Sequence, residues 1–298
     1  MCGIVGLFLK QRDLRPQLGA LTAKMLAVMN DRGPDSAGFA VYGEEVAGHC
    51  KITVRLAGDL DTATLAERLR AAGTHVSQAT AHGTHAVLEV RAADVERARA
   101  WLAETGVARF VSVGRRMELY KEVGPPQQVA ARFDLPAMAG THAIGHTRMA
   151  TESRVTTAGA HPFSTGTDQC LVHNGSLSNH NAVRRSLRHE GLTFETENDS
   201  EVAAGFLSWR MREGDSLKEA LQNSLAALDG FYTFVVGTEG GFAVLRDPIS
   251  CKPAVMAETD RYVAFGSEYR ALAVLPGIET ARVFEPEPAT VYVWEQKQ

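Results

Sequence analysis

The 298-residue sequence contains no long apolar run and no large excess of charge. A helix that spans a bilayer needs about 20 consecutive apolar residues, and no segment approaches that length. The net charge of −4 gives no electrostatic footprint for nucleic acid or for an anionic membrane surface. No basic segment precedes the first apolar stretch, as it would in a secretory signal, so the expected location is the cytoplasm.

Cysteine is scarce and scattered, as Cys2, Cys50, Cys170 and Cys251. The absence of a C-x-x-C pair or a cysteine cluster argues against a disulfide framework, and free thiols are expected for the last three. The ten histidines follow no spacing typical of zinc ligands, so no metal is assigned. With 45% hydrophobic and 22% charged residues, the composition is that of an ordinary globular protein.

Cys2 directly follows Met1. Removal of Met1 would leave a single residue carrying both a thiol and a free α-amine, whose ordinary pKa of about 7.7–8.0 makes it a usable base near neutral pH. A base beside a thiol is the arrangement of an activated nucleophile. The apolar residues 4–8 that follow predict a short buried strand. The alternative is a buried cysteine that merely opens this strand.

Residues 49–124 differ in pattern from the sequence on either side. The order strand, helix, strand, strand, helix, strand predicts a ferredoxin-like unit of modest size. We expect it to be inserted into a larger domain formed by residues 1–48 and 125–298. Gly124, followed by two prolines, marks its exit.

The larger domain is predicted to contain runs of strands and grouped helices, a pattern that favours sheets layered with helices. The helix over 199–212 is expected to be capped by Asp199 or Ser200, and Ser216 with Glu219 predicts a capping box. Helices are expected over 18–29, 179–190, 199–212 and 216–228, and strands over 38–42, 143–148, 169–173, 231–236, 242–246, 254–257, 262–266 and 290–294.

Four further segments carry polar groups suited to chemistry, over 32–38, 145–151, 173–175 and 197–201. Each is unremarkable alone. Arg32-Gly33-Pro34-Asp35 is a common turn, and Asn174-Gly175 is a frequent hairpin signal.

In this order, and together with Cys2, the segments resemble the class II glutamine amidotransferases, which are N-terminal nucleophile hydrolases. The resemblance covers both sides of the insert and extends to Ser267-Glu268. It implies an α+β fold with four αββα layers, in which two mainly antiparallel sheets are stacked. It also implies release of ammonia from the side-chain amide of L-glutamine through a γ-glutamyl thioester.

By position, the resemblance makes Cys2 the nucleophile, with its own α-amine as general base. It makes the side chain of Asn174 and the backbone N–H of Gly175 the oxyanion hole. A residue without Cβ at 175 would also allow the amide to approach the reacting carbon.

The same resemblance assigns the substrate contacts. Arg148 would bind the glutamine α-carboxylate, which suits a guanidinium because it bonds carboxylate bidentately. Asp199 would hold the α-ammonium, and Thr151 would contact the substrate.

The loop that supports the nucleophile would be formed by Arg32, Gly33, Asp35 and Ser36. Some family members have Trp, which serves there as a gate, and His where this chain has Met149 and Glu152. The resemblance therefore leaves gating open.

The resemblance and the insert account for nearly the whole sequence, so a separate synthase subunit is expected to use the ammonia. The pattern looks most like the detached amidotransferase subunits of glutamate-synthase-type complexes, such as the small subunit of N-methylglutamate synthase. In that family flavin and iron–sulfur clusters belong to partner subunits, and no cofactor is expected in this chain.

Two alternatives remain open at this point. The chain could be a stand-alone amidase that cleaves another γ-glutamyl amide, because such relatives share Cys2, Arg148 and Asp199. It could also be a non-catalytic regulatory or scaffold subunit, which predicts an unreactive Cys2.

Overall fold

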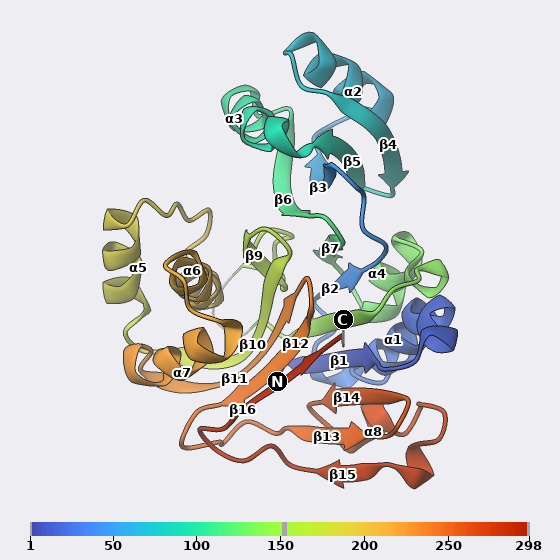
Figure 1. Ribbon diagram of the computed structural model, residues 1–298, viewed down its shortest axis with the longest axis vertical. Coiled ribbons are helices and arrows are strands. Elements are labelled where there is room, and N and C mark those ends of the chain that lie inside the picture. Colours follow the sequence, from blue (N-terminus) through green and yellow to red (C-terminus); the bar gives the residue numbers. More distant parts are fainter. Residues whose placement is uncertain (1, 151–153, 297–298) are drawn as a thin grey trace.

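The computed structural model describes residues 2–150 and 154–296. Its main body is built from two stacked sheets with helices on their outer faces (Figure 1). The first sheet has seven strands in the order β15-β13-β14-β1-β8-β2-β7, and the second has five in the order β16-β12-β11-β10-β9. Every registered strand pair within these described sheets is antiparallel.

The strands of the seven-stranded sheet are β1 (Gly3–Leu9), β2 (Ser36–Tyr42), β7 (Met117–Val123), β8 (His142–Arg148), β13 (Val255–Glu258), β14 (Tyr262–Gly266) and β15 (Arg282–Phe284). Those of the five-stranded sheet are β9 (Phe163–Gly166), β10 (Gln169–Leu177), β11 (Gly230–Thr238), β12 (Gly241–Arg246) and β16 (Val291–Glu295). Their outer helices are α1 (Leu18–Ala27), α4 (Pro126–Arg132) and α8 (Tyr269–Leu272) on the first sheet, and α5 (His180–His189), α6 (Asp199–Arg212) and α7 (Leu217–Ala227) on the second.

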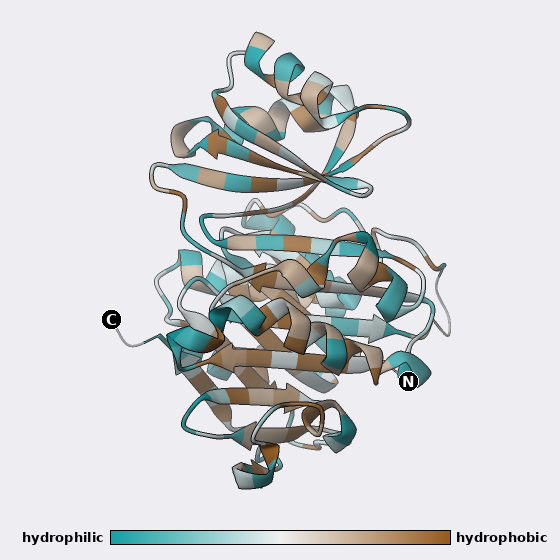
Figure 2. Cartoon of the chain, turned by 90° about the vertical axis from the view of Figure 1, so that its right-hand side faces the viewer, coloured by the Kyte–Doolittle hydropathy of each residue, from teal (hydrophilic) through white to brown (hydrophobic). Residues whose placement is uncertain are grey.

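Three apolar layers hold these elements together, and β1 contributes to two of them. Val5 and Leu7 pack under the helices of the seven-stranded sheet, whereas Ile4 and Phe8 face the five-stranded sheet. Burial on both faces explains why this strand is an unbroken apolar run rather than an alternating one. Figure 2 shows the apolar strands enclosed by helices whose outer surfaces are hydrophilic. The four-layer αββα prediction is confirmed.

The remaining sheet has four strands in the order β4-β5-β3-β6, with two helices packed against it. Its elements are β3 (His49–Leu56), α2 (Thr62–Ala71), β4 (Val76–His82), β5 (His85–Arg91), α3 (Val95–Thr105) and β6 (Ala108–Gly114). This is the ferredoxin-like arrangement expected from the sequence, and it stands apart at one end of the main body (Figure 1).

Strand β7 lies within the range expected for the insert but pairs with β2, in register from Ser36↔Val123 to Tyr42↔Met117. We therefore propose 49–114 as the inserted unit. Asp168 fixes its exit, because its buried carboxylate accepts the backbone N–H groups of Arg115, Arg116 and Met117 at 2.7, 3.0 and 2.9 Å.

Most helix boundaries agree with the sequence, and α6 begins and ends where it was predicted. Its cap was assigned wrongly, however. Asn198 is the N-cap, with extended backbone, and its side chain accepts the N–H of Ser200 at 2.8 Å. Asp199 is the first helical residue, which leaves its carboxylate available for other contacts. The capping box of Ser216 and Glu219 is present as predicted. In the described part of the chain, no helix combines the length and apolar character needed to cross a membrane.

Candidate active site

Strand β1 places Cys2 at the edge of the space between the two sheets. Gly3 pairs with Thr147 of β8, so the backbone just after Cys2 is fixed. The carbonyl oxygen of Cys2 accepts two hydrogen bonds, from Arg32 Nε at 2.9 Å and from Asn174 Nδ2 at 3.1 Å. Cys2 is partly buried, and its Sγ lies 3.8 Å from the carbonyl oxygen of Met149. The backbone of Cys2 is thus held by hydrogen bonds from two side chains while the residue remains partly exposed.

Arg32, in the loop after α1, contacts the backbone of Cys2. Arg32 is buried and forms an ion pair from Nη1 to Glu268 Oε1 at 2.6 Å, while its Nε bonds Cys2. The hydrogen bond from Arg32 lowers the pKa of the Glu268 carboxyl. One guanidinium therefore joins the residue at the start of β1 to the segment that follows β14. Glu268 was within the resembling segment, but its pairing with Arg32 was not foreseen.

The same loop fixes the end of β8. Asp35 accepts the N–H of Ala150 through Oδ2 at 2.8 Å and donates its own N–H to the carbonyl of Arg148 at 3.1 Å. Gly33 lies against the Arg148 backbone so closely that a Cβ would fall 2.5 Å from its nitrogen. Ser36 is directly opposite Arg148 in the β2–β8 register. The predicted supporting loop and the predicted arginine are therefore in direct contact.

Arg148 is 7% exposed at the end of β8, which places a nearly buried guanidinium on the strand beside β1. Thr151, the other expected substrate contact of this segment, lies outside the described residues, as do Glu152 and Ser153.

Asn174 and Gly175 lie within β10 and not in a turn. Gly175 has φ of +150°, and a Cβ there would fall 2.0 Å from the carbonyl oxygen of Phe231. Only glycine fits this backbone. The Asn174 amide donates to the carbonyl of Cys2 and, at 3.3 Å, to the hydroxyl of Ser267, so its nitrogen faces the Cys2 backbone.

The oxygen of the same amide is held by His146. The distance from His146 Nε2 to Asn174 Oδ1 is 2.9 Å, and because Nδ2 is a donor elsewhere, the histidine must donate here. Burial lowers the pKa of His146 to about 3, so the ring is neutral at physiological pH.

Asp199 approaches the same strand from the start of α6. Its Oδ2 accepts the N–H of Leu177, at the end of β10, at 2.9 Å. The aspartate side chain is 23% exposed, and Oδ1 lies 3.8 Å from Nδ1 of the buried His173. Burial also lowers the pKa of His173. A partly solvated carboxylate is thereby fixed two residues beyond Gly175.

Contacts among Ser200 and three histidines connect the start of α6 with His146 on β8. Ser200 Oγ lies 2.8 Å from His173 Nδ1 and 2.7 Å from His161 Nε2. His161 in turn stacks on His146, with ring centroids 4.1 Å apart. Sequence reasoning did not assign roles to these histidines, and their only signal was their position inside or beside the motifs.

The structure thus joins Cys2, Asn174 and Arg32 by direct hydrogen bonds and places Arg148 and Asp199 on neighbouring elements. Among the described residues, no group of three or more His, Cys, Asp and Glu side chains is arranged to hold a metal ion. The arrangement brings together a thiol, a side-chain amide, a nearly buried guanidinium at Arg148 and a partly exposed carboxylate at Asp199. These are the groups needed to bind an amino acid and attack its side-chain carbonyl.

Comparison with known proteins agrees with this chemistry. A family model described as a glutamine amidotransferase domain matches residues 146–274. The glutamine amidotransferase-like protein GlxB of Rhizobium meliloti (strain 1021) is 59% identical across 100% of this chain and 99% of its own length. The glutamine–fructose-6-phosphate aminotransferase (isomerizing) of Vibrio vulnificus (strain YJ016) is 37% identical over 116 residues, which are 39% of this chain and 19% of that protein.

Among solved structures, the glutamine phosphoribosylpyrophosphate amidotransferase of B. subtilis matches with a TM-score of 0.63 at 21% identity. The match covers 99% of this chain and 47% of that one, so the chain spans about half the length of this neighbour. At this identity, the likeness shows a shared fold.

Proposed function

Because this chain belongs to the class II glutamine amidotransferase family, a family of amide-hydrolysing enzymes, we propose that it hydrolyses L-glutamine to glutamate and ammonia with Cys2 as nucleophile. The observation that supports this most is the hydrogen bond from Asn174 Nδ2 to the carbonyl of Cys2. It brings a side-chain amide donor next to the thiol residue from a different sheet.

In the proposed reaction, the Cys2 thiol gives its proton to the α-amine freed by removal of Met1, and the sulfur adds to the γ-carbonyl carbon of glutamine. The negative charge on the carbonyl oxygen is stabilised by the N–H of Gly175 and by Asn174 Nδ2, which would exchange its 3.3 Å bond to Ser267 Oγ for the oxyanion. The carbon–nitrogen bond then breaks, and the amide nitrogen takes the proton and leaves as ammonia. Water attacks the resulting thioester, which releases glutamate and restores the thiol.

We propose that Arg148 and Asp199 bind the two charged groups of the substrate α-carbon. Arg148 suits the α-carboxylate because a guanidinium offers paired donors. Asp199 suits the α-ammonium because one oxygen is already fixed by Leu177 while the carboxylate remains partly exposed. Thr151 is proposed as a further substrate contact. Arg32, Gly33, Asp35 and Ser36 are proposed to hold the nucleophile and the arginine in place.

We also propose that a partner uses the ammonia, a glutamate-synthase-like subunit such as that of N-methylglutamate synthase. The support is the sequence resemblance of the motifs and of the insert. Affinity purification, followed by a glutaminase assay with and without the bound protein, tests it. The proposal of a partner is rejected if the pure chain is fully active and no synthase co-purifies with it.

The glutaminase itself is tested with Cys2→Ala. This variant should keep the wild-type circular dichroism spectrum and lose glutamine turnover by about a thousandfold or more. Cys251→Ala is the matched control, because Cys251 is exposed. A glutamine-like electrophile should add one label to the wild type and to Cys251→Ala, but none to Cys2→Ala. Intact mass reports whether Met1 has been removed. Turnover in Cys2→Ala equal to that of wild type would refute the assignment.

A further inference from the structure

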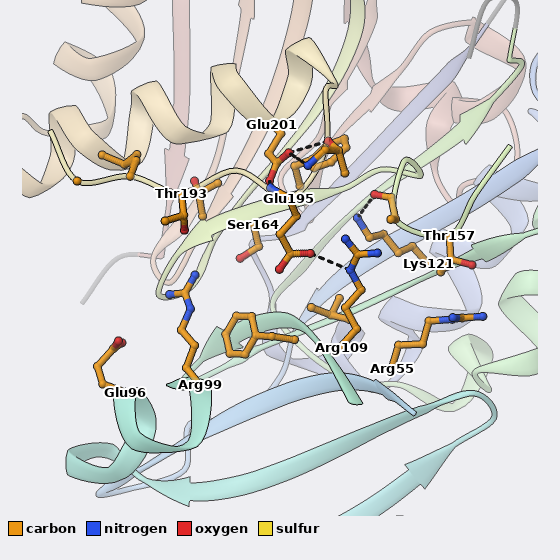
Figure 3. Close-up of a pocket in the computed structure, with 18 of the residues that line it drawn as sticks. Arg55, Glu96, Arg99, Arg109, Lys121, Thr157, Ser164, Thr193, Glu195 and Glu201 are labelled. Carbon is orange, nitrogen blue, oxygen red and sulfur yellow. Dashed lines mark hydrogen bonds and ion pairs between the residues drawn. The ribbon is translucent and has the colours of Figure 1, made fainter. Parts of the chain in front are cut away.

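A cavity of about 430 Å³ lies between the inserted sheet and the main body, and it is separate from the Cys2 site. Its walls come from α3 and β6 on one side and from β9 and residues 191–196 on the other (Figure 3). Cys2, Arg148, Asn174 and Asp199 do not line it. The residues of the candidate active site therefore do not account for this cavity.

The lining is rich in positive charge although the chain as a whole is acidic. It includes the cations Arg55, Arg99, Arg109, Lys121 and Arg212, against three carboxylates. Arg55 and Arg212 pair with Glu122 and Glu213, which do not line the cavity, so Arg99 and Lys121 carry the remaining positive charge. Two of the three lining carboxylates are already engaged. Glu195 pairs with Arg109 at 2.8 Å, and Glu201 accepts the backbone N–H groups of Glu195 and Thr196 at 2.7 and 2.8 Å.

Arg99 is the cation best placed to receive a ligand. Its guanidinium carbon lies 4.7 Å from the centroid of the Phe110 ring, a cation–π contact that orients the side chain. No carboxylate in the described part of the chain forms an ion pair with it. Figure 3 shows it extending from α3 toward Thr193 and Ser164, whose hydroxyls line the opposite wall.

Lys121 adds a buried charge beside this space. Its Nζ donates to the carbonyls of Ala158, Ala160 and Pro162 at 3.1, 2.9 and 3.3 Å and lies 4.5 Å from the centroid of the Phe163 ring. Within the described ranges no carboxylate comes within ion-pair distance of it. Burial lowers the pKa of this ammonium to about 8, although Glu201 and Glu195 favour its charged form. An anion in the cavity would favour the charged form further.

From these observations we propose that the cavity binds a small organic anion through a phosphate or carboxylate group, with Arg99 as its principal ligand. A guanidinium bonds either group bidentately, and hydroxyls on the facing wall supply further donors. The ligand would contact the insert and the main body at once.

Such a ligand would also act on the candidate substrate site. Residues 195–198 connect the cavity to α6. Glu195 and Thr196 line the cavity, and their backbone N–H groups bond the carboxylate of Glu201. Asn198 donates its N–H to Thr196 Oγ1 at 3.2 Å and caps the helix that begins with Asp199. The coupling rests on the proposed glutaminase function, whereas anion binding does not.

Binding is tested by isothermal titration of the full-length wild-type chain with inorganic phosphate and, separately, with citrate, which distinguish the two ligand groups. Arg99→Ala should weaken binding of the accepted probe about tenfold or more. Arg68→Ala removes an exposed arginine of α2 that forms no ion pair within the described part of the chain, and it should leave the affinity unchanged. Saturable binding that Arg99→Ala leaves intact, or no saturable binding of either probe, would overturn the proposal.

Coupling is tested by titrating glutamine into Cys2→Ala, which binds substrate without turnover, with and without the saturating anion. The dissociation constant should shift about fivefold or more, and glutamine should shift the anion affinity by the same factor. Equal constants reject the coupling. If glutamine does not bind at all, the proposed function fails while the anion titration still decides the cavity.

Discussion

The Nε2 atom of His146 donates to Oδ1 of Asn174 at 2.9 Å, and this bond determines which end of the amide faces Cys2. The pair links adjacent layers, since His146 is on β8 and Asn174 on β10. An asparagine amide reversed by 180° would present oxygen to the Cys2 carbonyl, which is repulsive. His146 is thus a positioning residue for the proposed oxyanion hole.

Replacement of this histidine should lower kcat and leave KM nearly unchanged. We expect His146→Leu to lower kcat about tenfold, whereas His146→Gln, which keeps an N–H donor, should recover part of the rate. Asn174→Ala should cost more, about 2.7–4 kcal/mol of transition-state stabilisation. Steady-state kinetics of the three variants decides this. An equal loss in the Leu and Gln variants would show that packing, not the donated bond, matters.

Asp199→Asn should raise KM for glutamine about tenfold or more, with a smaller effect on kcat. The amide keeps an oxygen for the N–H of Leu177 but loses the charge proposed to hold the α-ammonium. Asp260→Asn, at an exposed turn, is the matched control and should leave both constants unchanged. If the KM of Asp199→Asn equals that of the control, the aspartate does not contact the substrate.

Gly175→Ala should destabilise the fold by about 3 kcal/mol or more, because the backbone has φ of +150° and the new Cβ would collide with the Phe231 carbonyl. Gly240→Ala is the control, since a Cβ at Gly240 meets nothing within 4 Å. Urea denaturation monitored by circular dichroism measures both. A stable Gly175→Ala protein would mean that this backbone adapts more easily than the packing indicates.

The free energy of unfolding should fall as the pH is lowered from about 6.5 to about 3, in part because of His142. Burial lowers the pKa of this residue from 6.5 to about 3, so the unfolded chain takes up a proton that the folded chain refuses. In His142→Gln the slope of stability against pH should be shallower by about 1.36 kcal/mol per pH unit within that window. Urea titrations at several pH values provide the slopes, and identical slopes would contradict the assignment.

The four αββα layers followed from the family resemblance, whereas most strands and the longer helices were predicted from apolar patterns of their own. In the helix over 199–212, the apolar residues Val202, Phe206 and Leu207 recur at helical spacing. The unbroken apolar run of β1 predicted that this strand is buried. The cap was missed because Asn198, Asp199 and Ser200 are all good caps, and only the backbone decides among them. Strands β9 and β15 were not predicted, since segments of three or four residues give little periodicity, although the equally short β13 was expected over 254–257.

Within the site, the contacts that sequence could not supply are those between distant segments. Arg32 and Glu268 are 236 residues apart, and no local pattern pairs them. Asn174-Gly175 favours a hairpin by local rules, yet it lies inside β10. The conflict between local preference and observed structure falls where the proposed chemistry needs an unusual backbone.

Segments near a chain end ordinarily fray and exchange their amide hydrogens quickly. Strand β1 differs, because its residues pair with β14 along one edge and with β8 along the other while both faces are buried. Its amides should therefore rank among the slowest to exchange with deuterium. Thermal inactivation should then coincide with melting of the whole domain, rather than precede it through loosening of the residue that carries the thiol.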